Sequence, residues 1–177
     1  VQNMGRAKSK GVELELQGKL GDHFTYGVGY TYTDAYLAED AYTPTGGLIN
    51  TRGAALPGVS RNHFNASGDY SFQAAGGLFT LHLDGSYQSS SQNSLSQSVL
   101  YKYTLPGFTL WNASASYSRD AWTAALWLKN LTNTEGATGV YTTQYMGTAP
   151  SEGFYGNGSK LLTTLPRTVG VTVTYRF

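Results

Sequence analysis

The sequence TVGVTVTYRF, residues 168–177, alternates between two kinds of side chain without a break. Every second residue from Val169 to Phe177 is apolar or aromatic, and the residues between them are Thr, Gly or Arg. This alternation predicts a strand whose two faces meet different surroundings. In a soluble sheet the apolar face packs on a core, whereas in an outer-membrane barrel it contacts lipid and the polar face lines the lumen. The terminal Phe177, with Tyr175 before it, favours lipid, because frayed ends of soluble domains rarely hold large aromatic residues.

The composition supports a membrane strand and excludes several kinds of site. Charged residues are 13% of the chain, about half the usual share in soluble proteins. The net charge of +1 does not indicate a nucleic-acid partner. The sequence has no cysteine, which excludes disulfides, thiolate catalysis and cysteine-based zinc sites. No apolar run approaches the roughly 18 residues that a membrane helix needs, so any crossing must use strands.

The same alternation recurs along the chain and predicts about seven strands in total. Their expected ranges are 12–20, 24–36, 64–73, 79–88, 111–118, 122–129 and 169–177. Short turns at 21–23, 74–77 and 119–121 alternate with long polar loops at 37–62, 89–107 and 130–165. Short turns on one rim and long loops on the other are typical of outer-membrane barrels, with the turns periplasmic and the loops external. Loops of this length argue against a compact soluble sandwich. The expected fold is therefore all-β, made of antiparallel transmembrane β-barrel strands.

The odd number of strands predicts that the chain is part of something larger. Single-chain bacterial barrels have an even number of strands, and residues 1–10 show no apolar alternation that would supply another. We therefore expect an open sheet, in which 169–177 pairs with 122–129 on one side only. The alternatives are a complete small outer-membrane barrel with an adhesive or structural role, and a soluble β-domain.

Three blocks of the sequence resemble one family. They are NMGRAKSKGVEL at 3–14, LKNLTN at 128–133, and LPRTVGVTVTYRF at 165–177. In these blocks and their spacing the chain resembles the C-terminal third of a TonB-dependent outer-membrane receptor. The resemblance implies a barrel of about 22 strands, plugged by an N-terminal domain. It identifies residues 1–177 as the C-terminal segment of that barrel, with the plug domain absent from it.

The resemblance also implies function, location and partners. Receptors of this family import ferric siderophores, cobalamin, haem or glycans across the outer membrane of Gram-negative bacteria, with energy passed through TonB. The implied partners are outer-membrane lipid, a plug domain, TonB, and an iron chelate or similar ligand. The last strand is also similar to the signal that the barrel-assembly machinery recognises in outer-membrane proteins. That signal falls on Thr168, Gly170, Val173, Tyr175 and Phe177.

The predicted external loops are rich in aromatic residues. Together with an arginine, such side chains suit an amphipathic, anionic ligand such as an iron chelate. The alternative is that they pack loop against loop. The candidate ligand-binding residues are Tyr42, Arg52, Tyr101, Tyr103, Tyr141, Tyr145, Phe154 and Tyr155.

No catalytic, metal or cofactor site is predicted. The histidines, His23, His63 and His82, are spread over separate elements, whereas a metal site needs convergent ligands. No nucleophile motif occurs, so an enzyme is not expected. His82 and Asp84 fall on one face of a strand and predict a hydrogen bond within the barrel wall. Three glycines on the lumen face are expected to let a neighbouring backbone approach: Gly27, Gly29 and Gly170. Trp127 faces the lumen against the polar pattern and is expected to pack on a plug or on a lumen residue.

Overall fold

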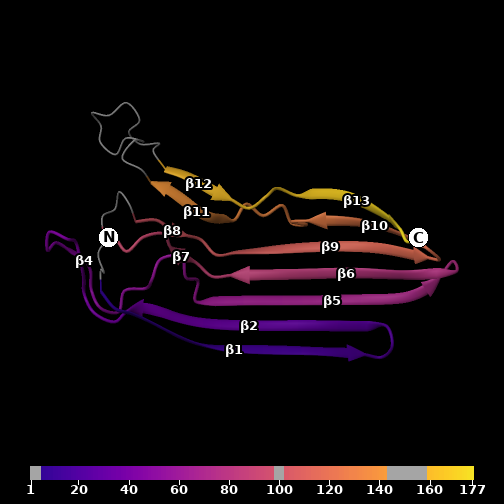
Figure 1. Cartoon of the computed structure of the whole chain (residues 1–177), viewed down its shortest axis with the longest axis horizontal. Coiled ribbons are helices and arrows are strands. Elements are labelled where there is room, and N and C mark those ends of the chain that lie inside the picture. The colour runs from indigo at the N-terminus through magenta and orange to yellow at the C-terminus, as the bar shows by residue number, and fades with distance from the viewer. Residues whose placement is uncertain (1–4, 98–101, 143–158) are drawn as a thin grey trace.

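The computed structural model describes residues 5–97, 102–142 and 159–177, and is organised around one antiparallel sheet of seven strands (Figure 1). The strands are β1 (Ala7–Leu20), β2 (Phe24–Leu37), β5 (Asn62–Ala74), β6 (Gly77–Gln88), β9 (Phe108–Arg119), β10 (Trp122–Lys129) and β13 (Thr168–Tyr175). They follow one another in the sheet in chain order, so β1 and β13 form its two edges. The expected open sheet is confirmed, and within the described residues β13 pairs with β10 alone.

The three short turns all lie at one end of the sheet (Figure 1). Ala74 pairs with Gly77, so only Ala75 and Gly76 connect β5 to β6. Both have positive φ angles, 51° and 75°, which give the turn the twist that a tight hairpin requires. Arg119 pairs with Trp122 across an equally tight turn between β9 and β10. The long connections meet at the opposite end, as the sequence predicts.

The strands run further toward the loop end than the apolar alternation indicates. β1 begins at Ala7 rather than at residue 12, and Ala7 pairs with Leu37 at the far end of β2. In the described part of residues 1–10 there is no further strand, as expected, but residues 7–10 lengthen the first strand beyond its predicted start. The apolar alternation ends before the strand does, because it marks only the part of the strand that faces apolar surroundings.

The long loops also hold paired strands that the sequence analysis did not predict. β3 (Ala41–Tyr42) pairs with β4 (Leu48–Asn50), and β7 (Ser91–Gln92) with β8 (Thr104–Leu105). In the third loop, β11 (Ala137–Thr142) pairs with β12 (Ser159–Thr163). These pairs are too short, or too polar on both faces, to give a recognisable period. They shorten the irregular parts of loops that would otherwise be unusually long.

The apolar side chains of the sheet are exposed. Val12, Leu14 and Val171 are 55%, 62% and 69% exposed, and they lie on the same face of their strands as the other predicted lipid-facing residues. The buried hydrophobic residues in the described ranges are Ala35, Leu37, Ala41 and Leu105, which lie at the loop end. We call the apolar face the outward face and the polar face the inward face. An apolar sheet face without a protein layer over it needs lipid or a partner to cover it. Among the described residues there is no helix long and apolar enough to cross a membrane.

Aromatic rings border the outward face near the turn end. The Phe79 ring lies 5.4 Å from that of Phe72 and 4.6 Å from that of Tyr117. Trp122 and Tyr175 continue the row on β10 and β13, with ring centroids 4.7 Å apart. Such a row is the girdle that amphipathic rings form at a membrane–water boundary.

A second girdle lies toward the loop end, where Tyr30, Tyr32, Phe64 and Tyr87 share the outward face. The Tyr30 hydroxyl donates a hydrogen bond to the Asn62 side chain at 2.8 Å, so its polar end is satisfied there. Along β5, Phe64 and Phe72 are about 27 Å apart by strand rise, which a tilt of about 40° reduces to about 20 Å. The outward face between the girdles is close to the apolar band of about 25 Å that lipid requires.

A matched pair of substitutions on β10 tests which face meets lipid. Leu126 points outward and its neighbour Ala125 points inward. With the protein refolded in lipid bilayers, Leu126→Arg is expected to lower the free energy of unfolding by about 2–4 kcal/mol, because it places a charge in hydrocarbon. Ala125→Arg is expected to lower the free energy of unfolding much less, since the new side chain points into a polar lumen. Urea titration measures both, and equal costs would contradict the assignment of the faces.

Candidate functional site

A hydrogen-bonded network of polar side chains crosses the inward face of the sheet. The His82 ring lies at its centre, with Nδ1 2.8 Å from Asp69 Oδ1 and Nε2 3.2 Å from Asp84 Oδ1. Asn112 Nδ2 donates to Asp84 Oδ2 at 2.8 Å, and the Asn130 amide donates to Asn112 Oδ1 at 3.0 Å. The predicted wall hydrogen bond between His82 and Asp84 is confirmed, within a network that joins β5, β6, β9 and the end of β10.

Asn130 connects this network to the base of the third loop. Its φ is 51°, a conformation that asparagine adopts more readily than most residues. Its Nδ2 donates to the carbonyls of Thr134 and Leu165 at 2.9 and 2.8 Å, and its Oδ1 accepts from the Thr134 amide. Asn133 Oδ1 accepts from the Arg167 amide at 2.9 Å. The sequence block 128–133 therefore fastens the end of β10 to the start of β13.

Trp127 has a local reason to face inward. It pairs with Gly170 on β13, and a Cβ on Gly170 would overlap its ring. Its Nε1 donates to Thr172 Oγ1 at 3.3 Å, and the Lys129 ammonium lies 5.6 Å from its ring centroid. Trp127 thus packs on a lumen residue, one of the two expected partners. The expected approach of a neighbouring backbone is wrong for Gly27, Gly29 and Gly170, because side chains of neighbouring strands lie nearest to all three.

The packing of Trp127 on Gly170 gives a double-mutant test. Gly170→Ala is expected to cost about 1–3 kcal/mol of stability, because the new methyl group displaces the ring. In a Trp127→Ala background the same change is expected to cost much less, since no ring remains to be displaced. Unfolding titrations of the four proteins give the coupling energy. If Gly170→Ala costs the same in both backgrounds, packing against the Trp127 ring does not explain the glycine at this position.

The residues that resemble the barrel-assembly signal lie on the free edge strand or just beyond it. Val173 is on the outward face and 61% exposed. The Tyr175 ring joins the turn-end girdle beside Trp122, and Phe177 packs edge-on against it with centroids 5.1 Å apart. Thr168 Oγ1 donates to the Pro166 carbonyl at the start of β13. Their recognition by the assembly machinery stays a prediction.

The predicted ligand-binding residues do not converge on one place. Arg52 and Tyr103 line two different pockets. Tyr42 on β3 and Tyr141 on β11 are exposed, and the Tyr42 hydroxyl lies 3.4 Å from Asp40 Oδ2. The other candidates fall outside the described residues: Tyr101, Tyr145, Phe154 and Tyr155.

Arg52 lies in a polar pocket of about 480 Å³ between the first and second long loops. Asn50 holds the two loops together, since its buried Nδ2 donates to the Leu95 carbonyl at 2.9 Å and its Oδ1 accepts from Gln97 at 2.6 Å. Lys102, on the second long loop, adds a second positively charged side chain to the pocket lining. Sequence analysis missed Asn50, Gln97 and Lys102, because only the folded loops bring them beside Arg52. The pocket lining includes no aspartate or glutamate: it consists of Asn50, Thr51, Arg52, Gly53, Ala54, Ala55, Gln92, Ser94, Gln97 and Lys102.

Tyr103 lies in a second pocket of about 360 Å³, between the second and third loops. Its amide donates to Asn93 Oδ1, and its side chain is 40% exposed. Phe108 and Leu161 add apolar surface to this pocket, and Glu135 adds a carboxylate. The loop end therefore offers one cationic polar pocket and one amphipathic pocket. In the described ranges, no group of three or more His, Cys, Asp or Glu residues could hold a metal ion.

These features define a class of protein. An open antiparallel sheet with an apolar outward face, two aromatic girdles, a polar inward face and long loops on one rim is the wall of a membrane β-barrel. The family model for the TonB dependent receptor-like β-barrel matches residues 1–131, which is most of the chain. The chain belongs to this family, and the resemblance found in its sequence is confirmed.

Known relatives agree with the family. The chain is 26% identical over 154 residues to the ferric-pyoverdine M114 receptor PbuA of Pseudomonas sp. (strain M114), covering 86% of the chain and 17% of that receptor. It is similar in fold to the siderophore receptor PiuA of Acinetobacter baumannii, with a TM-score of 0.72 and 18% identity over 96% of the chain and 22% of that receptor. The ferric yersiniabactin uptake receptor FyuA of Yersinia pestis gives a TM-score of 0.77 and 15% identity, over 99% of the chain and 24% of that receptor. The chain thus spans less than a quarter of the length of each of these relatives.

Proposed function

We propose that this chain forms part of the barrel wall and external loops of a transporter that imports a ferric siderophore or a similar large iron chelate. The observation that carries the proposal is the cationic pocket between the first two loops, on a barrel whose curated relative is a ferric-pyoverdine receptor. The location that follows is the outer membrane of a Gram-negative bacterium, with the long loops external.

The chemistry of the pocket supports an anionic ligand. Arg52 and Lys102 bring two positive charges to a pocket with no acidic lining residue. Arginine binds carboxylates and other planar oxygen groups through its fork of donors, and lysine adds a mobile positive charge. Amides from Asn50, Gln92 and Gln97 supply further hydrogen bonds. The neighbouring pocket with Tyr103 and Phe108 offers ring surface to the less polar part of a chelate.

The barrel wall supports the proposed import with a rigid frame and a polar inward face. The network around His82 cross-links the inward face, and Asn130 connects it to the base of the third loop. A stiff wall suits a role as the frame against which a plug domain moves. In this proposal the plug and its TonB contact are supplied by other parts of the whole protein, and TonB provides the energy. The family consists of receptors, and the proposal requires no catalytic group.

Substitution of the two pocket cations tests the proposal in the whole receptor. Arg52→Gln and Lys102→Gln are each expected to weaken binding of the ferric siderophore about tenfold, because each removes a charged hydrogen-bond donor. Ferric pyoverdine is the first ligand to use, followed by a panel of other ferric siderophores. Tryptophan fluorescence measures binding, and uptake of radioactive iron by cells measures transport.

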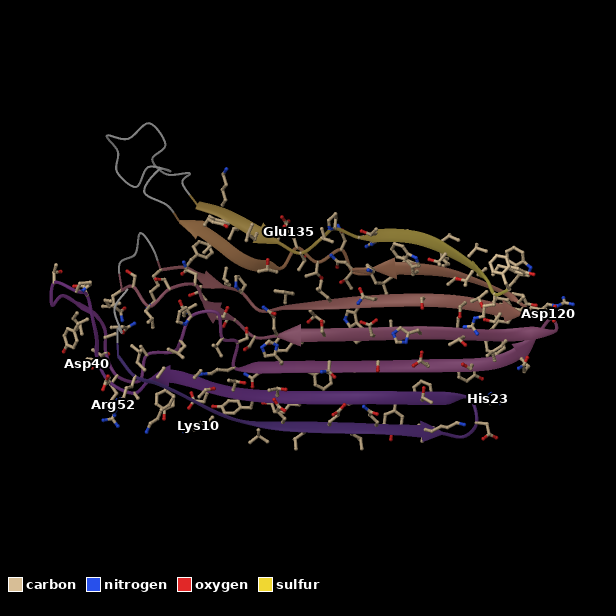
Figure 2. All side chains as sticks on the ribbon, viewed as in Figure 1. Lys10, His23, Asp40, Arg52, Asp120 and Glu135 are labelled. Carbon is tan, nitrogen blue, oxygen red and sulfur yellow. The ribbon has the colours of Figure 1, made fainter. Side chains whose placement is uncertain are left out.

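The matched control is Arg119→Gln, which removes one positive charge next to Asp120 at the turn end, whereas Arg52 lies at the opposite end of the sheet (Figure 2 labels Asp120 and Arg52). It is expected to leave binding and uptake unchanged. A receptor that binds none of the panel, or that binds equally well without Arg52 and Lys102, would contradict the proposed site.

A further inference from the structure

The outward face of β1 changes abruptly from basic to apolar. Lys8 pairs with Tyr36 and Lys10 with Asp34, and the next outward residues, Val12 and Leu14, pair with Tyr32 and Tyr30. Because side chains on one face recur every second residue, Lys8 and Lys10 point to the same side as Val12 and Leu14. The basic side chains lie toward the loop end, where Figure 2 shows Lys10.

The lysines belong to a cluster formed by β1, β2 and the residue that precedes β5. We call Lys8, Lys10, Asp34, Tyr36 and Arg61 the rim cluster. Asp34 lies between two cations, with Oδ2 3.6 Å from Lys10 Nζ and Oδ1 3.6 Å from an Arg61 guanidinium nitrogen. The Lys10 ammonium also lies 5.7 Å from the centroid of the Tyr36 ring.

The rim cluster carries an excess of positive charge that remains open to the surroundings. Lys10 and Arg61 share one carboxylate, Asp34, and Lys8 adds a third positive charge on the same face of β1, so the five residues of the cluster carry a net positive charge. The side chains of Lys10 and Arg61 are 70% and 58% exposed, whereas that of Asp34 is only 19% exposed. The carboxylate therefore balances only part of the charge of the two cations, whose remaining donors are free to meet an outside anion.

The rim cluster lies at the level along the membrane normal where lipid headgroups are expected. Lys10 lies one outward position beyond Val12, which pairs with Tyr32 of the loop-end girdle. Side chains just beyond a girdle lie among headgroups, where a lysine or arginine stem can run along apolar surface while its charge reaches polar groups. At the turn end the outward-facing Arg119 is instead paired with Asp120 at 3.6 Å, which balances its charge.

We propose that the rim cluster binds the phosphate groups of a lipid headgroup at the loop-end surface of the membrane. Lysine and arginine donors are suited to phosphate oxygens, and the positive excess provides the complementary charge. Val12, Leu14 and Leu16, exposed along the same line of β1, provide the apolar surface for the acyl chains of that lipid. The inference rests on the membrane placement in the proposed function, but not on the nature of the transported ligand.

The test uses the whole receptor in micelles of neutral detergent. The probe is a diphosphorylated glycolipid of the lipid A type, compared with the same glycolipid after removal of its phosphates and with inorganic phosphate alone. Native mass spectrometry or thermophoresis gives the affinity. The unaltered receptor is expected to prefer the phosphorylated lipid strongly over both comparison ligands.

Charge removal at the two rims then locates the site. The triple variant Lys8→Gln, Lys10→Gln, Arg61→Gln is expected to bind the phosphorylated lipid about a hundredfold more weakly, at about fivefold for each charge near a lipid surface. The control variant Lys19→Gln, Arg119→Gln, Arg176→Gln removes the same charge at the turn end and is expected to change affinity less than twofold. Asp34→Asn is expected to bind several-fold more tightly, since it removes the competing carboxylate, an effect that simple loss of folding cannot produce.

The outcomes that would overturn the inference are distinct. The inference is wrong if the rim-cluster triple variant binds the phosphorylated lipid as tightly as the unaltered receptor does. It is also wrong if the two triple variants lose the same amount of affinity, or if Asp34→Asn binds this lipid more weakly. Equal binding of the dephosphorylated glycolipid would exclude phosphate recognition, and competition by inorganic phosphate at comparable concentration would exclude a lipid-specific site. Ferric siderophore binding, measured in parallel on the same variants, is expected to be unchanged, so a failure of the transport proposal would be seen separately.

Discussion

The structure depends on the requirement that backbone amides and carbonyls in lipid find partners within the protein. Each unpaired group in hydrocarbon costs several kcal/mol, so strands can cross a membrane only within a continuous hydrogen-bonded ladder. Here the ladder runs from β1 to β13 without a crossover, with tight turns and long loops alternating between the strands. Because the backbone groups are paired in this way, the outward side chains between the two girdles can be apolar, and the inward side chains are free for polar contacts.

The inward face uses that freedom to join the wall to the loops. His82 and its two aspartates cross-link neighbouring strands, and the chain of contacts continues through Asn112 to Asn130. Asn130 then reaches the carbonyl that precedes Pro166, just before β13. The base of the third loop and the wall are therefore one hydrogen-bonded unit.

The alternation of apolar and polar residues predicted the seven strands, their order, the tight turns and the edge position of β13, because a lipid-facing strand repeats its chemistry at every second residue. It did not predict the extension of β1 to Ala7, since beyond the membrane both faces are polar and the period disappears. It also missed the short hairpins of the loops and the pocket around Asn50, which depend on contacts between distant segments. Arg52 was chosen from its residue type, whereas its partner Lys102 could be found only from the folded loops.

The packing of Trp127 against Gly170 on the inward face has a consequence for the fluorescence of the protein. The chain has three tryptophans, and Trp111 and Trp122 lie on the outward face, beside Gly85 and Tyr175. Trp127 alone among them faces the lumen, with a lysine ammonium near its ring. A quencher dissolved in the acyl chains would therefore quench the fluorescence of Trp111 and Trp122 but not that of Trp127. The emission that remains would come from the inward face, so this chain contains its own spectroscopic reporter of that side of the wall.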